Sequence, residues 1–218
     1  VVVIDSVTGE PLGNPWLTAI IDTNSRVPPG FVLSLARPSA TNISLCLSMS
    51  MIQKGFWLKK WGMDQDDFPV WGKWGTIQVD NELKNESSGI IKGCDRKNIE
   101  LEFRPLREPQ SGAFIESFLD TIDDETRNLP GFKSKNKRDK ENYNANEQAV
   151  FTSKSLYEVI AYFIIKIYCQ RKHSGLDRSP MSAYKENLIS SGIGIPDMVL
   201  GDEARDFILD FMPYYERT

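Results

Sequence analysis

Histidine and cysteine are scarce in this 218-residue chain. It has a single histidine, His173, and three cysteines, Cys46, Cys94 and Cys169, which lie far apart in the sequence. Zinc sites need several cysteine or histidine ligands at short, regular spacing, and the chain has no CxxC pair. A zinc-binding module is therefore excluded for these residues. The odd number of scattered cysteines is untypical of a disulfide framework and predicts buried free thiols in a reducing compartment.

Two other patterns are also missing. No apolar run reaches the roughly 18 residues needed to cross a bilayer, and no secretory signal opens the chain, so we expect a cytoplasmic protein. The phosphate-binding pattern GxxxxGK[ST] is absent, which argues against ATP hydrolysis. With 40% hydrophobic and 26% charged residues, the composition is that of one well-buried globular domain with some appendages.

An excess of basic residues is the third thing the chain lacks. Lysine and arginine number 26 against 30 aspartate and glutamate residues, which gives a formal net charge of −4. Domains that bind DNA tightly are usually basic, so this balance counts against tight DNA binding. A metal-dependent nuclease site, by contrast, requires carboxylates.

The first 50 residues predict three antiparallel strands followed by a helix. The apolar runs Val1–Ile4, Trp16–Ile21 and Phe31–Leu35 are separated by segments rich in turn-forming residues. A helix is expected to begin after Ser39, which suits the N-cap position. Residues 54–74 then hold four of the five tryptophans together with several lysines. Such side chains could grip DNA, but we favour a loop that the tryptophan rings pin to the core.

The stretch from Gly75 to Gly131 contains the main functional pattern. One strand is predicted to end on Asp80, a second strand covers Ile99–Phe103, and an amphipathic helix carries Glu116. The two acids are 36 positions apart in the sequence. A strand end that faces a helix can bring such distant carboxylates together.

Several short phrases accompany these acids in a fixed order. They are GEPLGNPWLTAIIDTNSR near the start, Asp-Asn at 80–81, Arg-Pro at 104–105, GAFIE on the helix, LPG after it and HSGLDRSPMSAY near the end. With them, the chain resembles the catalytic core of DDE transposases and retroviral integrases, and most closely the TnsB-like large transposase subunits of bacteria and their phage Mu-type relatives. The resemblance implies an α/β fold, in which a ribonuclease-H-like mixed five-stranded sheet is flanked by helices, with additional C-terminal helices.

The resemblance also implies a chemistry and a cofactor. Asp80 and Glu116 would be the second and third acids of a catalytic triad that holds two Mg²⁺ (or Mn²⁺) ions for phosphodiester cleavage and DNA strand transfer. Mg²⁺ prefers oxygen ligands, and paired ions stabilise both the attacking and the leaving oxygen. Each acid has an ordinary alternative, because Asp80 could cap a turn and Glu116 could be a solvated helix residue.

The first acid of the triad is expected outside this sequence. The resemblance places it on the opening strand, upstream of Val1, so the chain as given should not hold the full metal pair. Asp5 and Asp22 are interpreted instead as turn residues. Asn81-Glu82 stands where relatives often have Asn-Gly, which leaves the aim of Asp80 open.

Basic residues on both sides of the Glu116 helix are candidates for DNA contact. They are Arg104, Arg107, Lys133, Lys135, Lys137 and Arg138. Arginine can make bidentate contacts with phosphate, although solvated charge on loops is the alternative for all of them. His173 is expected to cap a turn rather than to act in catalysis.

Three regions are predicted along the chain. Residues 1–131 form the ribonuclease-H-like catalytic core, residues 132–152 a polar linker, and residues 153–218 a C-terminal helical part that in the family leads toward a β-barrel domain. The predicted function is that of the catalytic core of a DNA transposase. Two alternatives stay open: a non-catalytic DNA-binding or assembly protein on the same fold, and a hydrolytic nuclease without joining activity.

The expected partners also follow from the resemblance. They are the transposon ends and the target DNA, further copies of the chain assembled on DNA, a separate ATPase regulator and a second nuclease subunit. No membrane partner is expected, and the bacterial nucleoid would be the site of action.

Overall fold

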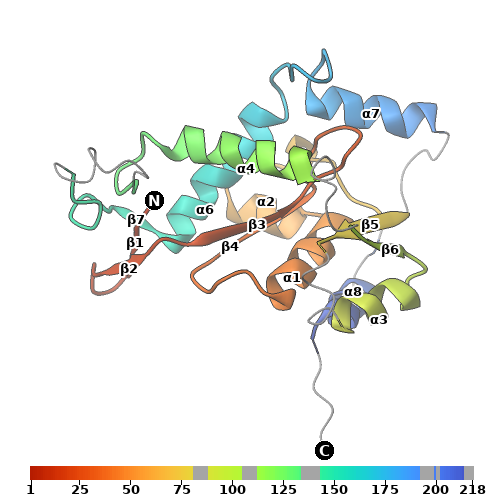
Figure 1. The fold of residues 1–218 in the computed structure, drawn as a ribbon, viewed down its shortest axis with the longest axis horizontal. Coiled ribbons are helices and arrows are strands. Elements are labelled where there is room, and N and C mark those ends of the chain that lie inside the picture. Colours follow the sequence, from red (N-terminus) through yellow and green to blue (C-terminus); the bar gives the residue numbers. More distant parts are fainter. Residues whose placement is uncertain (81–87, 105–111, 134–142, 192–198, 200–201, 214–218) are drawn as a thin grey trace, which may run out of the picture.

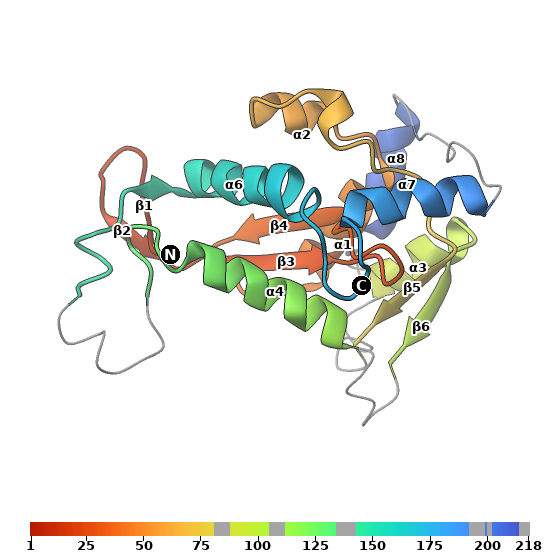
Figure 2. The same ribbon diagram turned by 90° about the horizontal axis from the view of Figure 1, so that it is seen from above.

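The computed structural model describes residues 1–80, 88–104, 112–133, 143–191, 199 and 202–213. These residues form a layered, mixed α/β fold, as expected (Figure 1). Helix α1 (Ala40–Met51) lies on one face of a pair of strands, and α4 (Ala113–Thr126) and α6 (Ser153–Tyr162) cover the other face. Figure 2 shows α4 and α6 running alongside the same strand pair.

The strands form three small sheets. In the first, β1 (Val3–Ile4) pairs antiparallel with β2 (Pro11–Gly13) and parallel with β7 (Phe151–Thr152). In the second, β3 (Trp16–Ile20) pairs antiparallel with β4 (Gly30–Ser34). In the third, β5 (Thr76–Val79) pairs parallel with β6 (Glu100–Phe103).

The single five-stranded sheet expected from the sequence is not formed by the described residues. A cavity of about 390 Å³ lies between β3 and β5, lined by Ala19 and Ile20 on one side and by Thr76–Val79 on the other. Each of the two strands has one edge paired, and the cavity keeps their remaining edges apart. The strand pairs therefore stay separate because no described segment fills the space between them.

Four further helices occur in the described residues, and the first of them lies in the tryptophan-rich segment, where a loop was expected. They are α2 (Gly55–Lys60), α3 (Ser88–Arg96), α7 (Pro180–Ser190) and α8 (Asp202–Phe211), with a 3₁₀ turn at Gln65–Asp67 and a π-helical segment at Phe163–Tyr168 that continues α6. α1 starts directly after Ser39, as predicted. Within the described ranges, no helix combines the length and the apolarity that crossing a bilayer requires.

Helix α1 packs against the β3–β4 pair at very short range. A Cβ atom on Gly30 would lie 2.1 Å from the carbonyl oxygen of Cys46, so only glycine fits at this point of β4. α1 also joins the two apolar clusters of the core. Met49 belongs to the cluster under α6, while Leu47 and Met51 belong to the cluster that holds β5, β6 and α8.

The tryptophan-rich segment is anchored to the core, as we favoured, but it is not a loop throughout, because Trp57 lies in α2 and a 3₁₀ turn follows at Gln65–Asp67. Trp61 stacks on Phe31 of β4 with ring centroids 5.6 Å apart. The indole nitrogen of Trp74 donates a hydrogen bond of 2.8 Å to the hydroxyl of Ser50 in α1. These rings serve packing rather than an exposed binding face.

A buried lysine holds the same segment to the end of α1. The ammonium group of Lys54 donates to the carbonyl oxygens of Ser50 and Ile52 at 3.4 Å each, and to that of Val70. The carbonyl groups at a helix C-terminus carry partial negative charge, so a cation there is favourable. Complete burial nevertheless lowers the pKa of Lys54 to about 7, since desolvation penalises its charged form.

Helix α8 packs closely against α3 at two glycine residues of α3. A Cβ atom on Gly93 would lie 2.6 Å from the Phe211 ring, and one on Gly89 would lie 2.6 Å from the carbonyl oxygen of Met212. Asp210 makes ion pairs with Arg96 at 2.7 Å and with Lys97 at 2.9 Å. The end of α8 is therefore packed against the core on both apolar and charged sides.

The cysteines are free and buried, as the sequence predicted. Burial raises the pKa of the Cys94 thiol to about 11, and raises the pKa values of Cys46 and Cys169 further in the same direction. Their thiols are therefore poor nucleophiles at neutral pH.

The stability of the fold should rise with pH because of Lys54. Its pKa is about 7 in the folded chain and 10.5 as the ordinary value, so between these limits the unfolded chain binds a proton that the folded chain does not. From pH 7 to pH 9, below the range in which tyrosines ionise, this contributes about 2 kcal/mol. Urea unfolding of Lys54→Met should show a flatter pH dependence than the wild type. The exposed Lys59→Met is the control, and equal slopes for all three proteins would contradict the assignment.

Substituting Gly93 should loosen the docking of α8. In Gly93→Ala the new methyl group meets the Phe211 ring and the carbonyl oxygen of Asp210 at 2.9 Å or less, so helix or ring must move. Overpacking of this kind costs about 1 to 3 kcal/mol, measurable by urea unfolding. Gly75→Ala is a matched control because nothing lies within 4 Å of its Cβ position. A Gly93→Ala protein as stable as this control would show that α8 does not pack as described.

Candidate active site

Asp80 follows directly on strand β5. Ile77 and Val79 of this strand are buried, and Val79 lies opposite Phe103 of β6 in a parallel register. Because the strands are parallel, Asp80 and Arg104 emerge at the same end of the pair. The backbone N–H of Arg104 donates to the carbonyl oxygen of Val79 at 2.9 Å, which fixes this register up to the last residue.

The side chains of Arg104 and Asp80 meet at this edge. Their Nη2 and Oδ2 atoms are 3.6 Å apart, and the side chains are 23% and 52% exposed, respectively. A pair this open to solvent contributes little to folding stability. It does show that the strand end presents a carboxylate and a guanidinium side by side.

Glu116 reaches the same place from the first turn of α4. The Cβ position of Gly112, the N-cap residue of α4, lies 2.5 Å from Nη1 of Arg104 and 2.9 Å from Oε1 of Glu116. Both side chains therefore crowd onto Gly112. Arg104 therefore lies beside Asp80 on one hand and, at Gly112, close to Glu116 on the other.

The cavity between the strand pairs opens at this constellation. Besides apolar side chains of β3, β5 and α1, it is lined by Asp22, Asp80, Glu102, Arg104 and Phe114. Phe114 belongs to the first turn of α4, two positions before Glu116. The candidate site is thus the mouth of a cavity with an apolar body and charged groups at one end.

Two carboxylates suit a hard cation, but they are fewer than a complete site needs. Oxygen ligands are those that Mg²⁺ prefers, and the Asp80 carboxylate already pairs with a cationic side chain. In the described part of the chain, no three histidine, cysteine or acidic side chains gather closely enough to hold a metal ion. The pair therefore fits part of a metal site.

The other two candidate acids are turn residues, as predicted. The carboxylate of Asp5 accepts hydrogen bonds from the backbone N–H groups of Val7 and Thr8. The carboxylate of Asp22 accepts from the N–H groups of Asn24 and Ser25.

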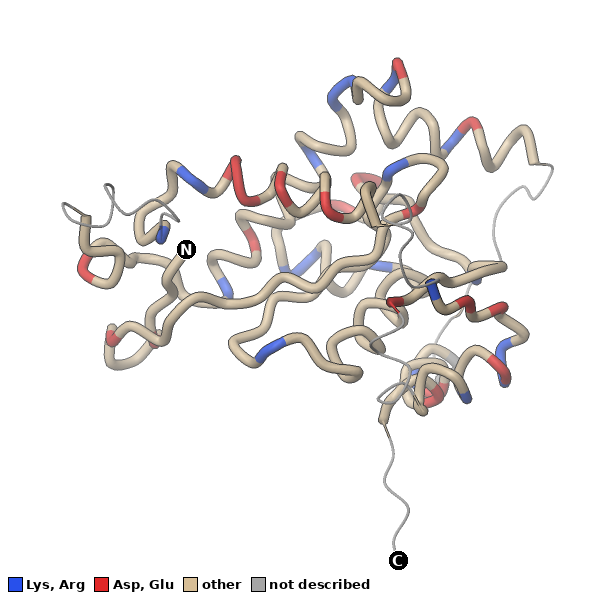
Figure 3. Tube along the Cα trace, viewed as in Figure 1, with Lys and Arg blue, Asp and Glu red and all other residues tan. Residues whose placement is uncertain are grey.

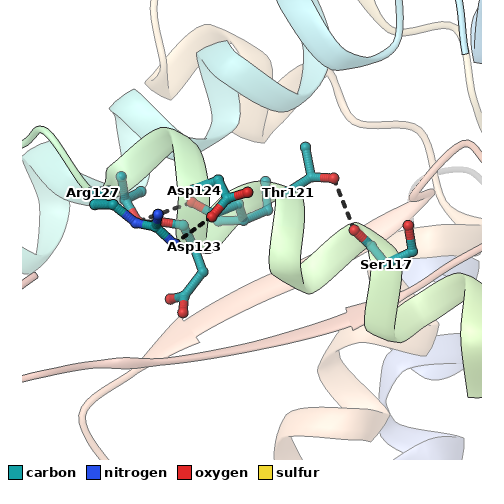
Figure 4. A network of polar contacts seen from close by, with 7 residues as sticks. Ser117, Thr121, Asp123, Asp124 and Arg127 are labelled. Carbon is teal, nitrogen blue, oxygen red and sulfur yellow. Dashed lines mark hydrogen bonds and ion pairs between the residues drawn. The ribbon is translucent and has the colours of Figure 1, made fainter. Parts of the chain in front are cut away.

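Further acids continue along α4 away from the cavity (Figure 3). Asp120 and Asp123 line a second, shallower hollow beside β3. Asp124 makes a 2.6 Å ion pair with Arg127, and Thr121 donates to the Ser117 carbonyl oxygen, as Figure 4 shows. This part of α4 has local partners and stands apart from the Asp80–Glu116 pair.

Most of the basic residues predicted for DNA contact lie outside the described residues. These are Arg107, Lys135, Lys137 and Arg138. Lys133 is exposed beyond the C-terminal end of α4, at the opposite end of the helix from Glu116. Arg104 alone among the described candidates is placed at the site.

Sequence reasoning missed one basic residue beside the site, Arg26. Its guanidinium carbon lies 3.3 Å from the centre of the Phe114 ring, which also lines the cavity. No periodicity reveals this contact, because it joins a strand turn to a helix that begins 87 positions later. His173 caps its turn as predicted: its Nδ1 atom accepts a 3.1 Å hydrogen bond from the N–H of Gly175.

Comparisons with known proteins agree with the resemblance. A family model described as the TnsB C-terminal domain matches residues 1–131, more than half of the chain. The chain is also 25% identical, over 203 residues, to a Staphylococcus aureus protein described as "Transposase for transposon Tn552". That alignment covers 93% of this chain but 38% of the relative, so the chain spans well under half the length of the relative.

Neither acid of the pair should be needed for folding. Since the contact of Asp80 is solvent-exposed, Asp80→Asn and Glu116→Gln should each change the free energy of unfolding by less than about 1 kcal/mol. Urea unfolding at pH 7 measures this. A loss of several kcal/mol in either variant would instead identify a structural ion pair, and would remove the reason to look for a function at these two residues.

Proposed function

Because the chain belongs to the TnsB C-terminal domain family, we propose that it carries part of the catalytic site of a DNA transposase, an enzyme that cleaves phosphodiester bonds and joins DNA strands. The observation that carries the proposal is that Asp80 and Glu116, 36 positions apart in the sequence, both lie near Arg104. Asp80 comes from a strand end and pairs with Arg104 at 3.6 Å, while Oε1 of Glu116 and Nη1 of Arg104 lie 2.9 Å and 2.5 Å from the Cβ position of Gly112. Neither a turn cap nor a solvated helix residue requires such proximity.

The roles of the residues follow from their chemistry. Asp80 and Glu116 would hold Mg²⁺ or Mn²⁺, which when bound stabilises the charge of the phosphate and lowers the pKa of the attacking water or hydroxyl. Asp80 and Glu116 belong to two different elements, so their relative position is set by the packing of α4 on the strands. Arg104 would move from the carboxylates to a phosphate oxygen, to which its planar guanidinium can donate two hydrogen bonds.

We propose in addition that the cavity accommodates one more strand, which completes a ribonuclease-H-like sheet. The edges of β3 and β5 that face it are unpaired within the described ranges, and the walls are apolar. A strand placed there would pair with both edges and end beside Asp80 and Glu116. The relative is far longer than the chain, and in the parent protein such a strand would bring the first acid of the triad.

DNA is the proposed substrate, as the transposon end and as the target. Assembly of several copies on DNA, a separate ATPase regulator and a second nuclease subunit belong to the same proposal and rest on the family resemblance. Action in the bacterial cytoplasm, on the nucleoid, follows from these partners.

One observation favours a second candidate function. Arg104 pairs with Asp80, and in the described residues no group of three or more acidic, histidine or cysteine side chains could hold a metal ion. A protein with this arrangement could bind DNA or assemble with sister subunits without metal chemistry. The two candidates differ in whether the acids bind a metal ion.

Mn²⁺ binding tests the proposal directly. Electron paramagnetic resonance should show free Mn²⁺ disappearing on addition of the chain, and Asp80→Asn and Glu116→Gln should each weaken this binding by about tenfold, or about 1.4 kcal/mol. Asp124→Asn is the control, because Asp124 lies on the same helix and is paired with Arg127. Equal Mn²⁺ binding by all four proteins, or none by the wild type, would overturn the metal role and favour the assembly protein.

A strand-joining assay separates transposase from nuclease. The parent protein, including the proposed additional strand, is given pre-cut transposon ends and a target plasmid with Mn²⁺. Joined products that disappear in Asp80→Asn support strand transfer. Cleaved but unjoined DNA would identify a hydrolytic nuclease.

A further inference from the structure

Arg26 is held in an unusual position by its turn. Its backbone has a φ of 65°, in the left-handed region that residues other than glycine seldom adopt. The turn is closed by hydrogen bonds from the Arg26 N–H to the carbonyl oxygen of Asp22, at 2.8 Å, and from the Tyr168 hydroxyl to the carbonyl oxygen of Arg26, at 3.2 Å. The backbone is thus fixed on both sides, and the side chain projects from a rigid support.

The guanidinium of Arg26 is stacked on an aromatic ring. Its central carbon lies 3.3 Å from the centre of the Phe114 ring, a cation–π contact on the first turn of α4. Stacking fixes the plane of the guanidinium, and Arg26 as a whole is half-buried. Phe114 is 38% exposed, so the stack lies at the surface.

The hydrogen-bond donors of the Arg26 side chain have few acceptors within the protein. Its Nη1 atom is buried, and among the described residues it has no hydrogen-bond partner. The nearby carboxylate of Asp22 already accepts three hydrogen bonds, from the N–H groups of Asn24 and Ser25 and from the Ser25 hydroxyl. No salt bridge of Arg26 occurs in the described part of the chain, so its charge is neutralised only at a distance.

Two more donors stand near Arg26. The pKa of His173 is lowered by burial first and then by the charges of Arg26 and Arg171, which places the three groups in one electrostatic neighbourhood. Because Nδ1 of His173 accepts a hydrogen bond from Gly175, its neutral ring carries the proton on Nε2, a donor. Arg171 is paired with Glu125 of α4 at 3.2 Å, which holds it beside the same helix.

This cluster borders the candidate active site. Phe114 lines the cavity together with Asp80 and Arg104, and Glu116 is two positions further along α4. A chain with a net charge of −4 has here a local group of donors, of which Nη1 of Arg26 has no acceptor among the described residues. A planar guanidinium that is fixed in place and short of partners is suited to bind a phosphate group. DNA offers phosphates at regular intervals along its backbone.

We propose that Arg26, stacked on Phe114 and flanked by Arg171 and His173, forms a binding site for a backbone phosphate of DNA beside the candidate active site. This inference rests on the proposed function. Arg26 is a positioning residue: it holds the strand so that a neighbouring phosphodiester faces Asp80 and Glu116.

The phosphate-binding role of Arg26 can be tested by fluorescence anisotropy. A labelled DNA duplex is titrated with the chain at several salt concentrations. Arg26→Gln should weaken binding at least about fivefold, since a hydrogen-bonded charge is lost. It should also make the slope of log K against log salt shallower by about 0.9, the value for one phosphate contact. Phe114→Leu should also weaken DNA binding, because the guanidinium loses the ring on which it stacks. Arg26→Lys should retain only part of the wild-type affinity.

Arg37→Gln is the matched control, because Arg37 is an exposed arginine on the segment between β4 and α1. It changes the net charge by the same amount and should leave affinity and slope nearly unchanged. Equal effects of Arg26→Gln and Arg37→Gln, or no DNA binding by the wild-type chain, would overturn the proposal that Arg26 binds a DNA phosphate. Mn²⁺ binding by Asp80 and Glu116 is measured without DNA, so a failure of the proposed phosphate-binding site is distinguishable from a failure of the proposed metal site.

Discussion

The close contact between helix α1 and strand β4 is the constraint on which the rest of the structure depends. At Gly30 there is no room for any side chain, because the Cys46 carbonyl oxygen would lie 2.1 Å from a Cβ atom. At this distance α1 reaches past the β3–β4 pair and contributes Leu47 and Met51 to the cluster that holds β5 and β6. The two separate strand pairs are therefore joined through one helix rather than through a shared ladder of hydrogen bonds, and the cavity between them is a result of that arrangement.

Periodicity and turn chemistry were enough to predict most of the elements. The strand ending at Asp80, the helix carrying Glu116 and the turns closed by Asp5 and Asp22 follow from local patterns, and the structure agrees. The position of Arg104 near the two acids depends instead on the parallel register of β5 and β6 and on the absence of a side chain at Gly112. The contact of Arg26 with Phe114 joins segments far apart in sequence. Pairing between elements is long-range information, and the described residues form three small sheets in place of the single five-stranded sheet that was expected.

Charge is distributed in a way that the net value hides. The acids of α4 follow one another along the helix, and two of them are paired with basic residues, Asp124 with Arg127 and Glu125 with Arg171. At the cavity mouth, in contrast, Arg104 and Arg26 bring positive charge next to Asp80 and Asp22. The proposed binding of DNA by an acidic chain would require such local compensation, because long-range repulsion is screened over about 10 Å at moderate salt while contacts at the site are not.

The separation of β3 from β5 also matters for the behaviour of the chain in solution. Each strand presents an edge that no described strand covers, and the space between the edges has apolar walls. An uncovered edge offers backbone N–H and C=O groups to any extended peptide, including a strand of a second molecule. Colloidal stability and crystallisability of this chain are thus tied to the same opening that faces the candidate active site.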